Sequence, residues 1–275
     1  MYKSELSKRL ISGFSIAFFA YWIIYFSSQT IFIAAVFLVA TIAIFEFERA
    51  IIGRGTPLRS VIFYFSHVLT FGAGWFFWKE DQENALICLA VLLAVNILAS
   101  LFAKREKETL GIFWYTIPSV WISLPFFLLI PIRFFRLDGI GSHLIFFLVV
   151  TVAFNDIFAY FGGKKFGKRL LAPKISPKKT IEGTFFGYVG AILMGSIVYS
   201  IYFKGTFSYL WIVITIILVT FSAQVGDLLE SKFKRYCGIK DSSNIIPGHG
   251  GVLDRFDALL TAIPLFWILL VLNEI

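Results

Sequence analysis

The chain contains a predominantly apolar run at residues 209–229, YLWIVITIILVTFSAQVGDLL, in which Asp227 is the one charged residue. Crossing the hydrocarbon core of a bilayer takes about 20 mostly apolar residues in a helix. Lipid offers no hydrogen-bond partners to the backbone, so a spanning segment is a helix or part of a closed barrel. The run therefore predicts a transmembrane helix with Asp227 near its C-terminal end.

Eight similar segments lie on either side of this run. They cover residues 10–26, 31–47, 61–78, 85–103, 110–132, 140–161, 184–203 and 258–272. Nine spanning helices use roughly 180 residues, which leaves no room for a separate soluble domain. The sequence predicts an all-α integral membrane protein, a polytopic bundle of about nine transmembrane helices. The first segment follows basic residues, as in a signal peptide, but it lacks a small-residue cleavage site and is expected to be retained.

The composition excludes two other classes of protein. Hydrophobic residues make up 58% of the 275 residues and charged residues 15%, whereas soluble domains have roughly 45–50% and 25%. A disordered chain is poor in apolar and aromatic residues, and this chain has 33 Phe and 7 Trp. A soluble globular domain and an intrinsically disordered chain are therefore both excluded.

Lysines and arginines are distributed unevenly between the two sides of the predicted bundle. The N-terminus and the even-numbered connections hold 21 of them, and the other side holds 4. Because cytoplasmic loops carry the excess of basic residues, the N-terminus is expected in the cytoplasm and the C-terminus outside. The net charge of +8 then reflects topology, and no nucleic-acid partner is expected. The short chain without a transit peptide favours the bacterial inner (plasma) membrane.

We expect one membrane-embedded unit with two functional parts. Residues 1–139 hold helices one to five, and residues 140–275 hold helices six to nine. The second part includes two long basic loops, at residues 164–183 and 231–257, which are expected to face the cytoplasm. Basic clusters of this kind serve topology or attract anionic lipid unless other residues indicate a ligand.

Two carboxylates and a hydroxyl lie on one face at the C-terminal end of the helix predicted at residues 209–229. Asp227, Glu230 and Ser231 are three and four residues apart, so they share a face of that helix. Acids at the edge of a membrane are costly and indicate function, and oxygen ligands suit a hard divalent ion. Cys88 and Cys237 have no metal-binding spacing, so neither a zinc site nor a disulfide is expected.

The other acids in or beside apolar segments have competing explanations. Asp254 and Asp257 stand where the last loop enters the final helix, where acids also act as caps. Asp156 has either a function or a polar bond between helices. Glu46 and Glu48 stand at a helix end, where a solvated interfacial pair is the preferred interpretation.

The loop at residues 231–257 combines several features that bind phosphate. Residues 247–251 read PGHGG, a turn whose backbone N–H groups can approach an anion closely. Side chains that donate to phosphate surround this turn, namely Lys234, Arg235, Lys240 and Arg255. A lone histidine such as His249 is more often a surface residue than a catalyst. The combination with the acids favours phosphate chemistry.

The loop at residues 164–183 ends in a second basic motif, SPKKTIEG at residues 176–183. Lys178 and Lys179 come directly before Thr180 and Glu182 at the start of a predicted helix, whose positive end attracts phosphate oxygens. An ordinary charged loop with a helix cap explains the same residues equally well.

Residues 231–257 resemble the C-terminal signature of the phosphatidate cytidylyltransferases, the CDP-diacylglycerol synthases of membrane lipid synthesis. That signature reads S-x-[apolar]-KR-x4-KD-x-[small]-x2-[apolar]-P-x-HGG-x-x-DR-x-D, and the chain matches every fixed position. The motif SPKKTIEG is similar to an upstream motif of the family, as are Asp156, Ala159 and Tyr160.

The resemblance implies that CTP and phosphatidic acid react to give CDP-diacylglycerol and pyrophosphate, with Mg²⁺ and room for a second metal ion. It also implies a homodimer in the lipid bilayer. The residues implied to be catalytic are Asp227, Asp254, Lys234, Arg235, His249 and Arg255. Those implied to bind substrate are Lys178, Lys179, Thr180, Glu182, Ser231, Lys240, Asp241, Gly250, Gly251 and Asp156. Those implied to hold metal are Asp227, Asp254, Asp257, Ser231 and Glu230.

Other functions use the same residues. Acids such as Asp156 and Asp227 suit an ion-coupled transporter, although their expected position at helix ends, next to phosphate donors, favours an enzyme. A CTP-dependent lipid kinase, or a cytidylyltransferase acting on another polar lipid, needs the same phosphate chemistry. A purely structural scaffold leaves the pattern of acids, glycines and basic residues unexplained.

Overall fold

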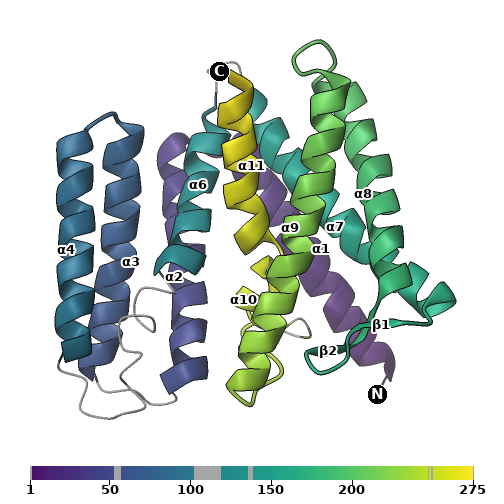
Figure 1. Cartoon of the computed structure of the whole chain (residues 1–275), viewed down its shortest axis with the longest axis horizontal. Coiled ribbons are helices and arrows are strands. Elements are labelled where there is room, and N and C mark those ends of the chain that lie inside the picture. The colour runs from purple at the N-terminus through teal and green to yellow at the C-terminus, as the bar shows by residue number, and fades with distance from the viewer. Residues whose placement is uncertain are drawn as a thin grey trace. The chain divides into compact units, whose positions relative to one another are not determined.

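The computed structural model describes residues 2–52, 57–101, 119–135, 139–246, 248 and 250–274, which are mostly helical (Figure 1). The longer helices are α1 (Tyr2–Phe26), α2 (Gln29–Ile52), α3 (Pro57–Trp78), α4 (Gln82–Leu101), α7 (Ile140–Phe166), α8 (Ile181–Tyr202), α9 (Tyr209–Tyr236) and α11 (Leu259–Glu274). The shorter elements are the π-helical turn η2 (Ser119–Ser123), α6 (Leu124–Arg133), the strands β1 (Leu170–Ala172) and β2 (Ser176–Thr180), and α10 (Leu253–Phe256).

Within the described ranges, five helices are long and apolar enough to cross a membrane. They cover Gln29–Ala50, Ser60–Trp78, Ile140–Phe166, Ile181–Tyr202 and Tyr209–Tyr236. Shorter apolar helices at Ile11–Phe26, Gln82–Leu98, Val120–Arg133 and Leu259–Asn273 coincide with the remaining predicted segments. The prediction of an all-α membrane protein is confirmed, whereas nine crossings and the orientation of the termini stay predictions.

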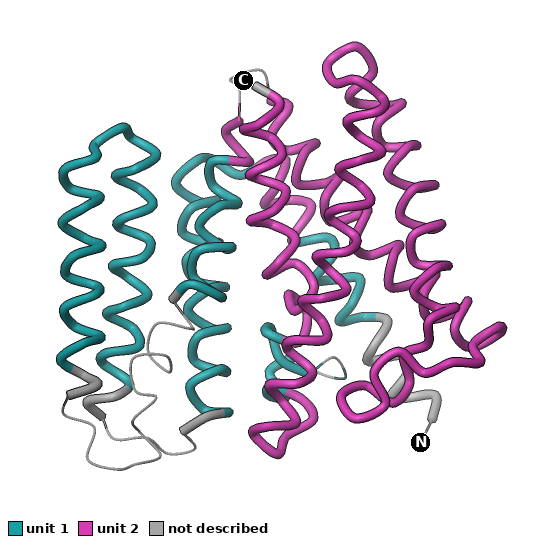
Figure 2. Tube along the Cα trace, in the orientation of Figure 1, with its two compact units in different colours: residues 1–19, 27–131, 242–253 teal, residues 20–26, 132–241, 254–275 magenta. Residues whose placement is uncertain are grey.

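The chain groups into two compact units, each built from several stretches of sequence (Figure 2). Unit 1 comprises Met1–Phe19, Ser27–Pro131 and Ser242–Leu253, and unit 2 comprises Ala20–Phe26, Ile132–Asp241 and Asp254–Ile275. The middle of residues 231–257 therefore belongs to unit 1 and the two ends to unit 2. The functional division at residues 139 and 140 stays a prediction.

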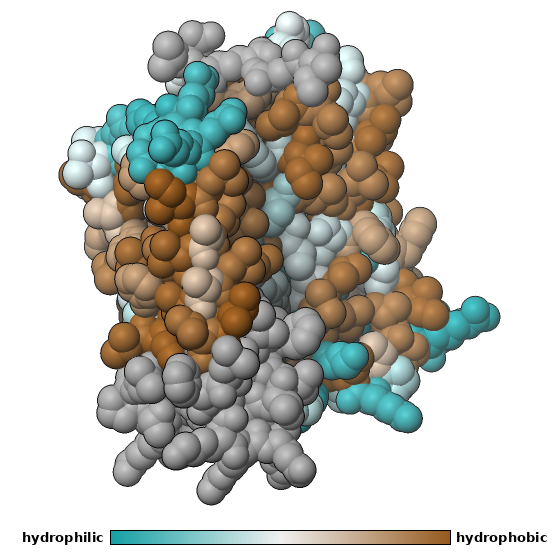
Figure 3. Space-filling model, turned by 60° about the vertical axis from the view of Figure 1, so that its left-hand side comes forward, coloured by the Kyte–Doolittle hydropathy of each residue, from teal (hydrophilic) through white to brown (hydrophobic). Residues whose placement is uncertain are grey.

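Unit 1 packs apolar helices around a small polar layer. His67 on α3 is buried, and its ring nitrogens lie 3.1 Å from Thr41 Oγ1 and 2.8 Å from Ser123 Oγ. Such partners are needed because water does not reach a buried polar group. On α4, large apolar side chains such as Leu86 and Ile87 are exposed, and Figure 3 shows hydrophobic side chains covering much of this side. An extended apolar surface of this kind is typical of contact with lipid.

Unit 2 depends on close helix contacts at small residues. Gly183, Gly187, Ala191 and Gly195 recur every four residues along α8 and are buried. Small residues at this spacing let two helix backbones approach closely. A Cβ atom at Gly187 would collide with Asn155 of α7. The side chains at the end of α7 and the start of α8 are thereby brought to the same end of the helix pair.

Helices α9 and α11 are joined by reciprocal hydrogen bonds. Ser222 Oγ donates to the Thr261 carbonyl at 2.9 Å, and Thr261 Oγ1 donates to the Ser222 carbonyl at 2.6 Å. One turn further along α9, the absence of a side chain at Gly226 leaves room for Thr261 and for the Asp257 backbone. This contact fixes the part of α9 that carries Asp227 against the chain that carries Asp257.

Candidate functional site

A cavity of about 590 Å³ lies in unit 2, where α7 ends and α8 begins. Its walls come from α7, the β hairpin, α8 and α9. The polar side chains in these walls are Asn155, Asp156, Tyr160, Lys164, Lys178, Lys179, Thr180, Thr184, Gln224 and Asp227. The cavity thus brings together several predicted substrate-binding residues and the predicted metal ligand Asp227, and it adds Lys164 and Gln224, which had no predicted role.

Lys179 of β2 and Asp227 of α9 form an ion pair in the wall of this cavity. Their side chains are 28% and 24% exposed, so a ligand in the cavity can reach both. Ser231 Oγ donates a long hydrogen bond of 3.4 Å to Asp227 Oδ1. Two residues that the sequence predicts to bind substrate and metal are therefore direct neighbours.

The β hairpin between α7 and α8 positions Lys179. Strand β1 pairs antiparallel with β2, and Glu182 at the start of α8 accepts hydrogen bonds from the amides of Lys168 (2.9 Å) and Arg169 (3.2 Å). Residues 164–183, predicted to be a loop, thus contain ordered strand pairing. Glu182 holds the hairpin and the helix together through backbone contacts, which local sequence does not reveal.

Thr180 caps the N-terminus of α8, because its Oγ1 accepts a hydrogen bond from the Gly183 amide at 3.1 Å. Thr180→Val keeps the shape of the side chain but removes this acceptor, so we expect the free energy of unfolding to fall by about 1 kcal/mol. Thermal unfolding of the purified protein in detergent measures the change. Thr206→Val, at an exposed threonine between α8 and α9, is the matched control. Equal unfolding midpoints for the two variants would contradict the capping role.

Asp156 ends a chain of amide hydrogen bonds that links α9 to α7. Gln224 Nε2 donates to Asn155 Oδ1 at 2.8 Å, and Asn155 Nδ2 donates to Asp156 Oδ1 at 2.9 Å. Asn155 is buried, so its amide needs both partners. The polar bond between α7 and α9 is thus made by Asn155, which in turn donates to Asp156 in the cavity wall, and a function for Asp156 stays a prediction.

A second charged cluster surrounds Lys234 near the end of α9. Its Nζ lies 2.6 Å from Glu230 Oε2 and 2.8 Å from Asp254 Oδ1. The side chain of Glu230 is 0% exposed and that of Asp254 is 5% exposed. Buried carboxylates need a charged partner, and here one cation serves two of them. Both predicted metal ligands in this cluster are therefore already compensated by a lysine.

The described part of the chain holds no preformed group of three His, Cys, Asp or Glu side chains that could bind a metal ion. The carboxylates of Asp156, Asp227 and Asp257 are nevertheless close enough to act on one another. Burial raises the pKa of the Asp257 carboxyl, and the charges of Asp227 and then Asp156 raise it further. Lys179 offsets part of this charge at Asp227. The carboxylate oxygens of these three aspartates are of the type that suits a hard divalent cation.

Several residues predicted to contact the substrates lie on the surface of unit 2. Lys178, Lys240, Asp241 and Arg255 are exposed. Arg235 is also exposed, and its Nη1 donates to the Ile239 carbonyl at 3.1 Å. The structure brings Lys178 to the cavity, and the roles of the other four stay predictions.

The glycine-rich turn of unit 1 requires two of its glycines for backbone reasons. Gly248 and Gly250 have φ values of 76° and 81°, which residues with side chains rarely adopt. The Ile246 amide donates to the Gly250 carbonyl at 2.9 Å and closes the turn. His249 lies outside the described residues, so its role stays a prediction.

The interpretation of Glu46 and Glu48 as a solvated interfacial pair is wrong. The two residues are 1% and 6% exposed. Glu48 accepts a hydrogen bond from Ser60 on α3, and Glu46 accepts hydrogen bonds from residues 196 to 207 positions away in the sequence. No local pattern reveals so distant a partner. The available signal was the cost of placing an acid in an apolar helix.

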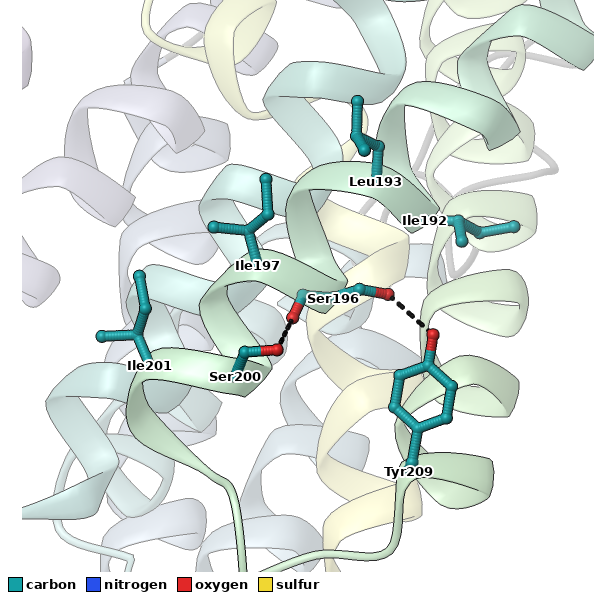
Figure 4. A pocket seen from close by; sticks show the side chains of 7 residues that line it. All are labelled: Ile192, Leu193, Ser196, Ile197, Ser200, Ile201 and Tyr209. Atoms are coloured by element: carbon teal, nitrogen blue, oxygen red, sulfur yellow. Dashed lines mark hydrogen bonds between the residues drawn. The ribbon is translucent and has the colours of Figure 1, made fainter.

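A second hollow in unit 2, of about 450 Å³, lies beside α8 and the start of α9 (Figure 4). Its lining is aliphatic apart from Ser196, Ser200 and Tyr209, and the hydroxyls of Ser196 and Tyr209 lie 3.4 Å apart. No described side chain with a formal charge lines it. It does not suit phosphate, whereas the cavity around Lys179 holds three lysines and two aspartates.

Known proteins are similar to this chain in sequence over much of its length. A family model described as the cytidylyltransferase family matches residues 7–273. The phosphatidate cytidylyltransferase of Bacillus subtilis is 36% identical over 193 residues, which are 70% of this chain and 69% of that protein. The proteins of the same name from Staphylococcus saprophyticus and Rickettsia bellii are 44% and 38% identical, over 70% and 65% of this chain and 72% and 77% of their own lengths.

Proposed function

Because the chain belongs to the cytidylyltransferase family, we propose that it transfers the cytidylyl group of CTP to phosphatidic acid. The products are CDP-diacylglycerol and pyrophosphate, as phospholipid biosynthesis requires. The observation that carries the proposal is the cavity of unit 2, where the paired Lys179 and Asp227 stand beside Lys178 and Asp156. The names of the bacterial relatives support the choice of substrates.

The reaction brings two polyanions together. An oxygen of the lipid phosphate attacks the α-phosphorus of CTP, the bond from that phosphorus to the β-bridging oxygen breaks, and pyrophosphate leaves. The lipid phosphate is already ionised near neutral pH, so no side chain has to act as the nucleophile. The protein has to position the reactants and offset their negative charge, and Lys178 and Lys179 are placed to do this from the cavity wall.

Further contacts with the substrates are proposed for residues around the cavity and in the family signature. These are Asp156, Thr180, Glu182, Ser231, Lys234, Arg235, Lys240, Asp241, His249, Gly250, Gly251 and Arg255. Charge-assisted hydrogen bonds from lysine and arginine are the strong interactions available to phosphate oxygens.

Mg²⁺, with room for a second metal ion, is proposed at Asp227 and Asp254, with Asp257, Ser231 and Glu230 as further ligands. These side chains supply only oxygen, which fits a hard divalent cation. When bound, the ion offsets charge on the transferring group and on pyrophosphate. The carboxylates of the chain would hold the ion, and Asp227 would have both the ion and Lys179 as partners.

We further propose a homodimer in the bacterial inner membrane, with the cavity facing the cytoplasm, where CTP is available. The excess of lysine and arginine in the N-terminus and the even-numbered connections supports this orientation. Asp156 and Asp227 lie in the C-terminal halves of α7 and α9 and share their cavity with Lys164, Lys178 and Lys179, which favours an enzyme over an ion-coupled transporter.

The direct test is pyrophosphate release by purified protein in detergent with CTP, Mg²⁺ and phosphatidic acid, each omitted in turn. We expect release only when all three are present, together with a CDP-lipid product. Release of CDP instead would indicate a CTP-dependent lipid kinase. Absence of release from a folded preparation would contradict the proposed substrates.

Lys179→Met should lower kcat/KM for CTP by about a hundredfold, since a charge-assisted contact to phosphate contributes about 1.5–3 kcal/mol. The variant also leaves Asp227 without its cation. Initial rates over a range of CTP concentrations measure the effect. Lys174→Met, at an exposed lysine between β1 and β2, is the matched control and should behave as wild type. Equal values for the two variants would remove Lys179 from the site.

A further inference from the structure

Glu46 lies in α2 of unit 1 and is almost completely buried. Its Oε1 accepts hydrogen bonds from Ser243 Oγ (2.6 Å) and the Val252 amide (2.9 Å). Its Oε2 accepts from Ser242 Oγ (3.1 Å) and the Leu253 amide (2.7 Å). All four donors belong to Ser242–Leu253, here called the glycine-rich segment, which is part of unit 1 together with α2.

The donors satisfy the buried carboxylate and come from both ends of the glycine-rich segment. Each carboxylate oxygen has two lone pairs, and each of these oxygens accepts two hydrogen bonds. Ser243 Oγ also accepts from the Ile245 amide at 3.1 Å, which leaves its hydrogen for Glu46. One side chain therefore ties the first two residues of the segment to its last two.

Gly251 shows how closely the glycine-rich segment approaches Glu46. A Cβ atom at this position would overlap the Ser242 hydroxyl and the Glu46 carboxylate. A glycine is needed here for space, whereas Gly248 and Gly250 are needed for their positive φ values. The glycines thus have two separate tasks, to form the turn and to seat it against α2.

We propose that Glu46 is a positioning residue for the transfer reaction. It fixes both ends of the glycine-rich segment within unit 1, and with them Gly250 and Gly251. The inference rests on the proposed function, in which Gly250 and Gly251 of the segment contact the substrates. Glu46 acts through the segment and not by touching the substrates.

Glu46→Gln tests the proposal with little change in size. The amide replaces one acceptor oxygen by an NH₂ group, which cannot accept the hydrogen bonds that the segment offers. We expect hydrogen–deuterium exchange at Val252 and Leu253 to become about tenfold faster and kcat/KM for CTP to fall about tenfold or more, mainly through KM. Glu48→Gln is the matched control, since Glu48 is a buried acid of the same helix whose partner Ser60 lies outside the segment.

A second variant approaches the same contact from the other side. Ser242→Ala combined with Ser243→Ala removes two donors while Glu46 stays, and it serves as the test if Glu46→Gln does not fold. We expect a change in the same direction in exchange and in KM. Added to Glu46→Gln, the serine pair should change kcat/KM little further, because the shared contact is already lost. Additive losses would show that Glu46 does not act through the segment.

Exchange and activity together separate this proposal from the proposed function. Unchanged exchange at Val252 and Leu253 in Glu46→Gln overturns the contact, and faster exchange with unchanged kcat/KM overturns its part in the reaction. Faster exchange in Glu46→Gln, when the wild-type protein transfers no cytidylyl group, overturns the proposed function and leaves the contact between Glu46 and the segment standing.

Discussion

Asp227→Asn should lower cytidylyl transfer by on the order of 10³-fold and leave the protein folded. Asp227 pairs with Lys179 and accepts a hydrogen bond from Ser231 in the cavity wall. Asparagine has nearly the same size but no negative charge, so it neither binds the lysine as an ion nor serves as an ionised ligand. Pyrophosphate release at saturating CTP and phosphatidic acid, over a titration of Mg²⁺, measures the loss.

The same substitution of aspartate by asparagine at Asp81 provides the control. Asp81 Oδ2 accepts a hydrogen bond from Asn84 Nδ2 at 2.7 Å beside the start of α4 in unit 1. Asp81→Asn should therefore transfer cytidylyl groups as wild type does. A folded Asp227→Asn protein with the same Mg²⁺-dependent turnover as Asp81→Asn would remove Asp227 from the chemistry.

Lys234→Met should remove activity and lower the free energy of unfolding by about 3–5 kcal/mol. Lys234 is the cation between Glu230 and Asp254, both of which are buried. Methionine fills a similar volume but takes away the positive charge that Glu230 and Asp254 share. The measurements are thermal unfolding in detergent and pyrophosphate release by the fraction that remains folded.

A second substitution distinguishes this explanation from simple loss of packing. Glu230→Gln added to Lys234→Met removes the charge of one of the two carboxylates that lose their contact with Lys234, so we expect part of the lost stability to return. Lys232→Met, two residues away on α9 and exposed, should change neither stability nor activity. If the double variant is no more stable than Lys234→Met, the ion pairs are not the source of the effect.

The helices could be predicted from the sequence because a long apolar segment indicates that lipid surrounds it. A run such as residues 209–229 has few alternatives to a helix once lipid surrounds it. The sequence also placed Asp227 beside Ser231, since a spacing of four residues on a helix puts two side chains on one face, and the two do form a hydrogen bond. The pairing of Lys179 with Asp227 was not predictable, although both residues were selected.

The features that the sequence did not reveal depend on distant partners. The β hairpin at residues 170–180 relies on Glu182, which binds the amides of Lys168 and Arg169, and amides have no signature in the sequence. The role of Lys234 at phosphate stays a prediction, and its contacts with Glu230 and Asp254, which no sequence pattern indicates, depend on how α9 and α10 pack. A list of charged residues identifies the components of a site but not their pairing.

The contact between Glu46 and the glycine-rich segment also predicts that the C-terminal part of the chain needs the N-terminal part. A fragment that starts at residue 140 keeps every residue that resembles the family signature, but it lacks α2. Its glycine-rich segment would lose the carboxylate that accepts from two of its hydroxyls and two of its amides. We therefore expect the N-terminal helices to be inherited together with the C-terminal ones in one gene. They are not expected to be replaceable by an unrelated membrane anchor.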